Sequence, residues 1–387
     1  MKVCVITYKA CWQDESGCWL SSGGFPLQMR GIASLFDEMT LVTVGVEGGT
    51  GGVPLPGNAR IIPMEGPSGK DLLRKISVIG RSGYYLPRII SAVREADVVH
   101  TPLPGDLPLL GMLVAVVYRK KLFVRYESSW SPNSQTTLGN RITRALVRCF
   151  ASKRNVMFVT GEGAVRPAPR LEWLFATSLS QHELDAVTPQ LDKGLSDPPR
   201  IVYFGRLSTE KGVLVLLKAI GLLRQQGLIL EAAIVGDGPE RDFLENQARQ
   251  LGCQSLVRFT GQLGREPLAH EAGMADFCVQ PSFTEGYSKA WLDAMAFGLP
   301  VMSSEVGAAR AVIGEEEERG WLVPPGDSGA LAARLRDVVN EKRDWGALRR
   351  RCRAYVETRT LEAWTERIAT RCGQSWGLKR VQGRFRT

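Results

Sequence analysis

The sequence lacks the patterns that mark most metal and hydrolase sites. Its eight cysteines form no CxxC pair, and it has only three histidines, His100, His182 and His270. No GxSxG segment is present, and no cysteine or histidine has metal-ligand spacing. We therefore expect reduced thiols, no metal centre and no serine- or cysteine-based hydrolysis.

Long apolar runs are also missing. The nearest to one, LPLLGMLVAVVY (107–118), ends before RKK and falls short of the roughly 20 residues that span a bilayer. It predicts a packed helix, with an interfacial helix as the alternative. No secretion signal is visible, because the apolar run in MKVCVITYK is only about five residues long. These absences favour a cytoplasmic protein.

Negative charge is scarce at the C-terminal end. Residues 1–190 carry 21 Lys/Arg and 15 Asp/Glu, residues 191–341 carry 15 and 21, and residues 342–387 carry 13 and 4. The excess gathers in RRRCR (349–353) and KRVQGRFR (379–386). Such a tail suits an anionic partner such as a lipid surface. The alternative is a solvated basic tail with no partner.

Two series of short apolar, β-branched segments predict an α/β protein with two Rossmann-like, doubly wound domains. The first series is 2–7, 39–45, 96–101, 121–127 and 155–160, and the second is 200–205, 230–236, 257–261, 276–280 and 300–304. The polar, proline-containing segment 188–200 between them is the candidate linker. We expect an N-terminal domain over 1–190, a C-terminal domain over 191–360, and a helix with a basic tail over 361–387 that packs back on the first domain. Ligands of such sheets bind at the carboxyl ends of strands, so the predicted site lies in a cleft between the domains.

Glycine-rich turns follow the first strand of each series. Gly23 and Gly24 precede a helix expected at 27–36, where backbone N–H groups and the helix dipole favour a phosphate. A glycine pair is also an ordinary turn, and the insertion of roughly 17 residues after the strand is incompatible with a GxGxxG dinucleotide fingerprint. VGDGPE (235–240) resembles a strand-to-helix turn whose glycines support the loop beside it.

The segment FGRLSTEKG (204–212) carries two cations on a loop that leaves the second series' first strand. Arg206 and Lys211 would emerge together at the carboxyl edge and could clamp a diphosphate. In isolation, the two residues fit a pair of solvated loop charges better than a clamp.

Two carboxylates lie eight positions apart in PSFTEGYSKAWLDAMAFGLPV (281–301). A helix beginning near Gly286 or Tyr287 would direct its free N–H groups at a phosphate, with Glu285 just before it accepting from sugar hydroxyls. Asp293, two turns on, suits a ribose diol because a carboxylate accepts two O–H donors at once. Locally, a helix-capping Glu285 and a surface Asp293 fit as well.

Of the three histidines, only His100 lies where a strand would direct it toward the predicted cleft. It ends the segment ADVVHT, so it is a candidate site residue, and a capped histidine at a strand end is the alternative. His182, near the linker, and His270, in a predicted helix, suit structural positions.

In order and spacing, the motifs resemble the family 4 glycosyltransferases, retaining enzymes of the GT-B architecture. The set is the GG loop, FGRL-x3-KG, VGDGP, FTGQL, PSFTEGYSKAWLDAMAFGLPV and GWLVPPGD (320–327). The resemblance is specific over residues 195–365 and weaker before them.

The resemblance implies roles for individual residues. Arg206 and Lys211 would bind the diphosphate of a sugar nucleotide, and Glu285 would contact the donor sugar as the first acid of an E-x7-E motif. Further donor contacts would come from backbone or side-chain groups of Gly23, Gly24, Gly205, Gly286, Tyr287 and Ser288. The implied reaction needs no metal and no other cofactor, because the cations and the helix end stabilise the leaving diphosphate.

The sequence departs from the family pattern at two positions. The second acid of the motif is Asp293 rather than glutamate, which puts ribose binding or nucleotide choice in question. In LFVRYESSW (122–130), Glu127 occupies the place where many relatives have a histidine, so a carboxylate would face the anomeric centre or the acceptor. Arg125 and Trp130 would line the same acceptor side, as would His100.

The expected function is therefore the transfer of a hexose-type sugar from a nucleoside diphosphate, UDP first, to a hydroxyl of a glycan or lipid-linked acceptor. Its partners would be the donor, the acceptor and an anionic membrane surface that the protein meets from the cytoplasmic side, with no nucleic acid. The two departures leave open a non-catalytic sugar-nucleotide-binding protein or partner subunit. A GT-B-fold epimerase is the third reading, disfavoured by FGRL-x3-KG.

Overall fold

The structure, a computed structural model of the 387-residue chain, describes residues 1–49, 51–69, 71–130, 137–315 and 318–386. The chain forms two compact units, the first of Met1–Ser178 with Leu361–Thr387 and the second of Leu179–Thr360. The segment 188–200, expected to be a linker, lies inside the second unit. There the Lys193 ammonium donates to the carbonyl oxygens of Met274 and Ala275 at 2.6 and 3.1 Å, which ties the segment to that unit's core.

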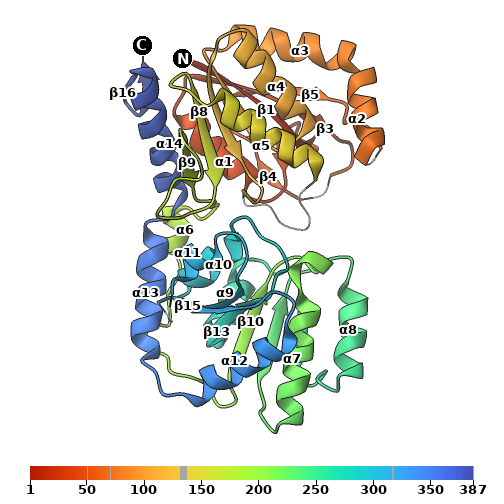
Figure 1. The fold of residues 1–387 in the computed structure, drawn as a ribbon, viewed down its shortest axis with the longest axis vertical. Helices are drawn as coiled ribbons and strands as arrows, with labels where there is room; N and C mark the ends of the chain where they lie inside the picture. The colour runs from red at the N-terminus through yellow and green to blue at the C-terminus, as the bar shows by residue number, and fades with distance from the viewer. Residues whose placement is uncertain (50, 70, 131–136, 316–317, 387) are drawn as a thin grey trace. The chain divides into compact units, whose positions relative to one another are not determined.

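The first unit is built on a parallel sheet in the order β5-β3-β1-β6-β7-β8-β9 (Figure 1). The strands are β1 (Lys2–Gln13), β3 (Glu38–Gly45), β5 (Ala59–Met64), β6 (Val98–Leu103), β7 (Lys121–Tyr126), β8 (Asn155–Thr160) and β9 (Leu171–Leu174). Short strands β2 (Trp19–Ser21) and β4 (Val53–Pro54) extend the sheet beside β1. Buried apolar side chains along β1 and β6 to β8 account for this order, since parallel strands are covered on both faces.

Helices cover both faces of this sheet. On one face lie α3 (Ser82–Glu95), α4 (Asp106–Val117) and α5 (Leu138–Phe150), and on the other α1 (Phe25–Ser34) packs against α14 (Leu361–Trp376). Helix α2 (Asp71–Gly80) precedes α3. The packed helix expected at 107–118 is confirmed as α4, whose Leu107, Met112 and Ala115 are fully buried. Within the described residues, no helix combines the length and apolarity that crossing a bilayer requires.

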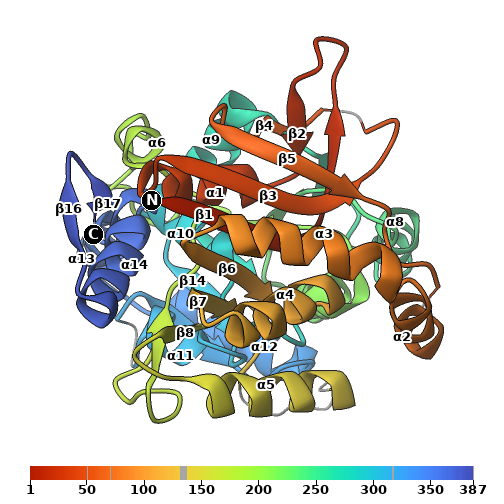
Figure 2. The ribbon, with the colours of Figure 1, turned by 90° about the horizontal axis from the view of Figure 1, so that it is seen from above.

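The C-terminal segment belongs to the first unit. After α14, the hairpin of β16 (Lys379–Val381) and β17 (Arg384–Arg386) places Phe385 against Phe36, with ring centroids 5.4 Å apart. Figure 2 shows the hairpin beside α14. Its three arginines are paired: Arg380 binds Glu366 through two hydrogen bonds of 2.5 and 2.8 Å, and Arg384 and Arg386 both bind Asp37. These arginines are therefore engaged within the molecule, although they share two carboxylates and the hairpin stays positively charged.

The second unit has six parallel strands in the order β12-β11-β10-β13-β14-β15. They are β10 (Arg200–Phe204), β11 (Glu231–Val235), β12 (Val257–Gly261), β13 (Phe277–Gln280), β14 (Val301–Ser304) and β15 (Gly320–Val323). Helices α7 (Val213–Gln225), α8 (Arg241–Gln250) and α12 (Ser328–Asn340) lie on one face, α7 beside α12. The remaining helices are α6 (Gln181–Asp185), α9 (Arg265–Met274), α10 (Lys289–Ala296), α11 (Ala309–Ile313) and α13 (Trp345–Glu357), with α13 packed on α10.

From the centre of this sheet, successive strands are added on one side from β10 to β12 and on the other side from β13 to β15. The order in which strands are added therefore reverses between β10 and β13, although all six strands stay parallel. The loops that leave two such strands diverge to opposite faces and open a crevice at the carboxyl edge, where doubly wound sheets bind ligands. In this unit those loops begin at Gly205 and Pro281, the two segments that the sequence singled out. The predicted pair of doubly wound α/β domains is thus confirmed in both units.

Candidate functional site

The loops that follow β10 and β13 interlock. Gly212 ends the short 3-10 helix η1 (Thr209–Lys211) with φ +67°, and a Cβ there would lie 2.1 Å from the carbonyl oxygen of Pro281. The Phe283 N–H donates to the carbonyl oxygen of Glu210 at 2.9 Å, which joins the loops one step further along. Only glycine satisfies both the left-handed backbone and this close approach. The result is a fixed position for the neighbouring Lys211.

Lys211 and Glu285 form an ion pair across the two loops. The ammonium lies 2.5 Å from the Glu285 Oε1 atom, and the Ser282 hydroxyl donates to the same oxygen at 3.1 Å. The Glu285 side chain is 11% exposed, so the pair is neither buried nor freely solvated. Two residues 74 positions apart in the chain are therefore held as one charged unit.

Glu285 does not cap the following helix. Helix α10 begins at Lys289 with Ser288 as its N-cap, two to three residues later than the sequence predicted. The carbonyl oxygen of Gly286, which would start the helix, instead accepts from the Ala308 N–H at 3.0 Å. Gly286 and Tyr287 therefore stay outside the helix, and the Glu285 carboxylate serves the ion pair rather than the helix end.

Arg206 projects from the start of the loop after β10. Its carbonyl oxygen accepts from the buried Tyr203 hydroxyl at 3.0 Å, which fixes the backbone while the side chain stays exposed. Among the described residues, no hydrogen bond or ion pair of the guanidinium is found. Burial, with the nearby Glu285 carboxylate, raises the pKa of Tyr203, so its hydroxyl remains a donor.

A hollow of about 770 Å³ opens at this edge, beside the ends of β10, β11 and β12. It brings together Arg206, from the loop after β10, and Asp293, from helix α10. Burial raises the pKa of Asp293 to about 6, with Lys289 opposing the shift. Asp293 is thus not the ordinary surface residue that its local sequence allowed. The remaining lining residues are Phe204, Gly205, Val235, Gly236, Asp237, Gly238, Gln262, Leu263, Leu268 and Phe297.

The glycines of VGDGPE support this hollow structurally, as the sequence indicated. A Cβ on Gly236 would lie 1.8 Å from the Gly205 carbonyl oxygen, and one on Gly238 would lie 2.3 Å from that of Leu207. Asp237 turns back to accept from the Gly238 N–H at 2.7 Å. The hollow therefore has, in rigid walls, one guanidinium without a hydrogen bond or ion pair among the described residues and the two carboxylates of Asp237 and Asp293, which suits an anion that also carries hydroxyl groups.

In the first unit, His100 and Arg125 are buried together. The His100 ring stacks on Phe123 with centroids 4.1 Å apart, and its Nδ1 lies 3.0 Å from the Phe123 carbonyl oxygen. The Arg125 Nε–H donates to His100 Nε2 at 3.3 Å, so Nδ1 carries the proton and the ring is neutral. Burial, with Arg125 nearby, holds the pKa of His100 well below its ordinary value. His100 has no exposed surface, so it does not face a ligand.

Arg125 links several segments of the first unit. One terminal nitrogen donates to Gln28 Oε1 at 3.1 Å, the other lies 2.7 Å from Glu127 Oε1, and the guanidinium sits 4.8 Å from the Trp364 ring. Of the four acceptor-side candidates, only Glu127 has an appreciably exposed side chain. Trp130 is mostly buried, with its Nε1–H donating to the Pro167 carbonyl oxygen at 3.1 Å.

Gly23 and Gly24 lie at the start of α1, as predicted, although the helix begins two residues earlier than expected. Gly23 has φ +66°, and Gly24 is the N-cap without a side-chain cap. The segment before them is mostly ordered strand, because β1 continues to Gln13 through a register shift and pairs with β2.

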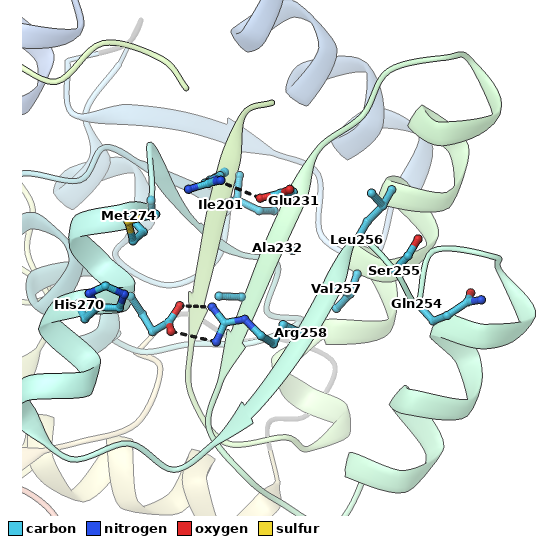
Figure 3. A pocket seen from close by; sticks show the side chains of 14 residues that line it. Ile201, Glu231, Ala232, Gln254, Ser255, Leu256, Val257, Arg258, His270 and Met274 are labelled. Carbon is cyan, nitrogen blue, oxygen red and sulfur yellow. Dashed lines mark hydrogen bonds and ion pairs between the residues drawn. The ribbon is translucent and has the colours of Figure 1, made fainter. Parts of the chain in front are cut away.

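A second hollow of about 560 Å³ lies at the opposite, amino edge of the β10–β12 strands (Figure 3). Its charged side chains are matched: Arg258 binds Glu271 through two hydrogen bonds of 2.9 and 2.5 Å, and Arg200 binds Glu231 at 2.9 Å. His270 is exposed at its margin, in a helix as the sequence predicted. Within the described residues, no group of three or more His, Cys, Asp or Glu side chains could hold a metal ion.

Comparisons with known proteins converge on one family. Residues 191–359 match the family model described as glycosyl transferases group 1. The amylovoran biosynthesis glycosyltransferase AmsK of Erwinia amylovora is 34% identical over 175 residues, which cover 44% of this chain and 43% of AmsK. Glycogen synthase of Mycobacterium tuberculosis is 33% identical over 178 residues, 46% of this chain and 42% of that enzyme. These matches span about two fifths of the relatives' own length.

Solved structures resemble nearly the whole chain. Sucrose-phosphate synthase from Thermosynechococcus elongatus aligns with a TM-score of 0.67 at 21% identity, covering 97% of this chain and 98% of that one. HepE of Anabaena, solved in complex with UDP, aligns with a TM-score of 0.66 at 18% identity, covering 96% and 99%. At these identities the likeness establishes the fold, which is the GT-B architecture that the motifs implied.

Proposed function

We propose that the chain is a glycosyltransferase that uses a nucleoside-diphosphate sugar, because its residues 191–359 match the model of the glycosyl transferases group 1 family. The observation that carries the proposal is the shared hollow of Arg206 and Asp293 at the strand-order reversal, beside the Lys211–Glu285 pair. A nucleotide sugar has the chemistry this edge would bind: an anionic diphosphate, a ribose diol and a hydroxyl-rich sugar.

The donor would occupy the site in a defined order. The Arg206 guanidinium, which forms no hydrogen bond or ion pair among the described residues, would bind the diphosphate. Asp293 would accept from the ribose hydroxyls in the hollow. Lys211 would share its ammonium between Glu285 and a phosphate oxygen, which leaves Glu285 to accept from hydroxyls of the donor sugar.

In the transfer step, the acceptor hydroxyl oxygen would bond to the anomeric carbon as the bond from that carbon to the diphosphate oxygen breaks. The nucleoside diphosphate leaves with the bonding electron pair, and its developing charge is stabilised by Arg206 and Lys211. The acceptor proton passes to a donor phosphate oxygen, so no protein base is required. We further propose that the anomeric configuration is retained and that no metal or other cofactor takes part.

UDP and a hexose remain our proposal for the donor, supported by the UDP found in HepE. A glycan or lipid-linked hydroxyl is the proposed acceptor, since one structural neighbour, WaaG, is involved in lipopolysaccharide biosynthesis. In the first unit, Glu127 would approach the acceptor, and Gly23 and Gly24 would approach the donor. His100, Arg125 and Trp130 would act behind them as supports, because all three are buried.

The test is a panel of nucleoside diphosphates and their sugars. Thermal shift of the full chain identifies the base and the sugar, because a ligand that binds only the folded state raises the melting temperature. Release of nucleoside diphosphate in the presence of candidate glycan and lipid-linked acceptors then measures turnover. Repeating the reaction with a chelator tests metal independence.

The outcomes separate the alternatives. Binding with glycosylated product supports the proposal, and NMR of the new linkage reports retention. Donor binding without product from any acceptor supports a non-catalytic binding protein, and release of an altered free sugar without acceptor supports an epimerase. No shift with any nucleotide would reject the donor site itself.

A further inference from the structure

Helix α5 exposes an apolar stripe with a basic margin. Leu138, Ile142, Ala145 and Cys149 follow one another at helical spacing and are all exposed, Leu138 by 69% and Ile142 by 49%. Arg141 and Arg148 are exposed along the border of this stripe. The opposite side of the helix buries Thr143, Arg144 and Val147. The stripe is thus additional to the face that attaches the helix to the core.

The anchoring of α5 is tight. Val147 belongs to the core of the first unit, and Arg144 donates to the Trp130 carbonyl oxygen at 2.6 Å. The Arg148 guanidinium lies 4.9 Å from the Trp130 ring, which holds the outward cation near the helix. The exposed stripe is therefore presented on a rigid element.

Helix α2 presents a similar surface. Ile76 and Ile79 are 57% and 73% exposed and share a face with the exposed Lys75. A Cβ built on Gly139 of α5 lies 3.4 Å from the Lys75 ammonium, so this cation adjoins the first turn of α5. We call Lys75, Ile76, Ile79, Leu138, Arg141, Ile142, Ala145, Arg148 and Cys149 the α2–α5 surface.

The charged residues that define the α2–α5 surface are all cations. The α5 sequence contains no acidic residue, and neither Lys75 nor Arg141 has an ion pair among the described residues. Two acids near this surface whose side chains the structure describes are engaged elsewhere: Asp106 with Arg74 at 2.9 Å, and Glu65 with Arg81 at 2.8 Å. Apolar side chains bordered by unpaired cations match the boundary of an anionic bilayer, where acyl chains lie under negative headgroups.

The sequence's own candidate for membrane contact was the C-terminal tail. Its three arginines are already engaged, since Arg380 pairs with Glu366 and both Arg384 and Arg386 pair with Asp37. Large apolar side chains are sparse on that hairpin, where Phe385 is buried and Val381 is exposed. The tail therefore keeps a positive charge but offers no apolar stripe comparable with that of α5.

We propose that the α2–α5 surface docks the protein on an anionic lipid bilayer, with the apolar stripe of α5 entering the headgroup boundary and its arginines contacting lipid phosphates. Binding to vesicles requires no donor or acceptor, so this inference stands or fails separately from the proposed transferase activity.

The first experiment is sedimentation of the full chain with vesicles of equal parts phosphatidylglycerol and phosphatidylcholine, compared with phosphatidylcholine alone. We expect binding to the anionic vesicles that weakens with added salt. The double variant Arg141→Glu with Ile142→Asp should bind at least about tenfold more weakly, because it removes an apolar contact and reverses one charge. Melting curves confirm that the variant is folded.

Two matched controls locate the effect. Ile229→Asp makes the same apolar-to-acid change at a residue of the second unit that is 46% exposed, and it should leave vesicle binding unchanged. Replacing Arg380, Arg384 and Arg386 by alanine tests the tail, and binding should be retained. If the tail variant abolishes binding while the α5 variant keeps it, the proposal is wrong.

The second experiment uses the exposed cysteines. Among the eight, only Cys18 and Cys149 are exposed, and Cys149 lies on the α5 stripe. A polarity-sensitive fluorophore at Cys149 in a Cys18→Ser chain should shift to the blue on anionic vesicles. The same label at Cys18 in a Cys149→Ser chain should not shift.

Three outcomes overturn the inference: no preference for anionic vesicles in the unaltered chain, a shift only from Cys18, or a shift from Cys149 without lipid. In the last case the stripe would pack against a second copy of the chain. Sedimentation equilibrium would then show a dimer that Ile142→Asp dissociates.

Discussion

The second unit carries two hollows at opposite edges of one sheet, and they differ in charge more than in size. At the carboxyl edge, the space of about 770 Å³ contains Arg206, whose guanidinium forms no hydrogen bond or ion pair among the described residues, together with Asp237 and the partly buried Asp293. At the amino edge, the hollow of about 560 Å³ is bordered by Arg258 and Arg200, and each of these arginines is bound to a glutamate. Both hollows are lined by polar and apolar residues.

The difference shows what a hollow needs in order to bind an anion. A guanidinium that already holds a carboxylate in two hydrogen bonds gains little from a phosphate, because the exchange breaks one strong pair to form another. An unpaired guanidinium loses nothing comparable. Strand topology adds to the contrast, since the loops that diverge where the strand order reverses, after β10 and β13, leave from the carboxyl edge. The following predictions test this contrast, beginning with the largest effect.

Glu285→Gln should reduce turnover about a hundredfold or more, because the charge that holds Lys211 and accepts from the donor sugar is removed. The measurement is kcat from nucleoside diphosphate release, with melting curves to verify folding. The matched change at the amino edge, Glu271→Gln, breaks the pair with Arg258 and should leave kcat within about twofold. Equal losses from the two variants would remove the distinction between the edges.

Gly212→Ala should lower the free energy of unfolding by about 3 kcal/mol, because the new Cβ meets the Pro281 carbonyl oxygen in a left-handed backbone. Denaturant titration measures it. Gly227→Ala is the control for the backbone alone, since Gly227 has φ +81° with no atom within 4 Å of a built Cβ. Its expected cost is about 1 kcal/mol. A similar cost at both glycines would mean that the two loops are not interlocked.

Lys211→Ala should weaken binding of the nucleoside diphosphate by about 2 kcal/mol, roughly thirtyfold in Kd, as one charge-assisted contact is lost. Calorimetry measures the change. Arg258→Ala removes a cation from the amino edge and should leave the same Kd unaltered. An unchanged affinity in Lys211→Ala would exclude that residue from the phosphate site.

The affinity for an intact nucleotide sugar should fall about five- to tenfold between about pH 8 and pH 5. Since burial raises the pKa of Asp293 to about 6, its carboxylate, the form that accepts from two hydroxyls, is lost below that value. Asp293→Asn should bind weakly at every pH and show a flat profile over this range. A variant that keeps the slope would assign the titration to another group.

The fold was predictable where apolar runs are long and uninterrupted. The segments that became β3, β8, β10 to β14 and α4 were found within one or two residues, because buried parallel strands are strongly apolar. Strands β5 and β9 were missed: ARIIPM contains a proline and two half-buried isoleucines, and LEWL is only four residues long. The continuation of β1 to Gln13 was missed because a register shift interrupts its alternation.

The order of the motifs in the sequence predicted which residues are candidates for the site, but not which side chains they contact. Sequence located Arg206, Lys211, Glu285 and Asp293, yet the ion pair between Lys211 and Glu285 depends on a contact between distant loops. The burial of His100 beside Arg125 likewise arises from tertiary packing. The role of Gly212 left one signal in the sequence, since a glycine follows Lys211 directly at the end of FGRLSTEKG.

Helix α14 and the β16–β17 hairpin complete the first unit from the end of the chain, with the whole second unit inserted before them. A ribosome therefore releases the entire second unit before it supplies the helix that packs on α1, and Phe385, which covers Phe36, is made later still. The nascent first unit must wait with α1 and the Arg125–Trp364 contact site uncovered until α14 has been translated. A stop codon in place of Leu361 would leave the second unit whole and the first unit unfinished.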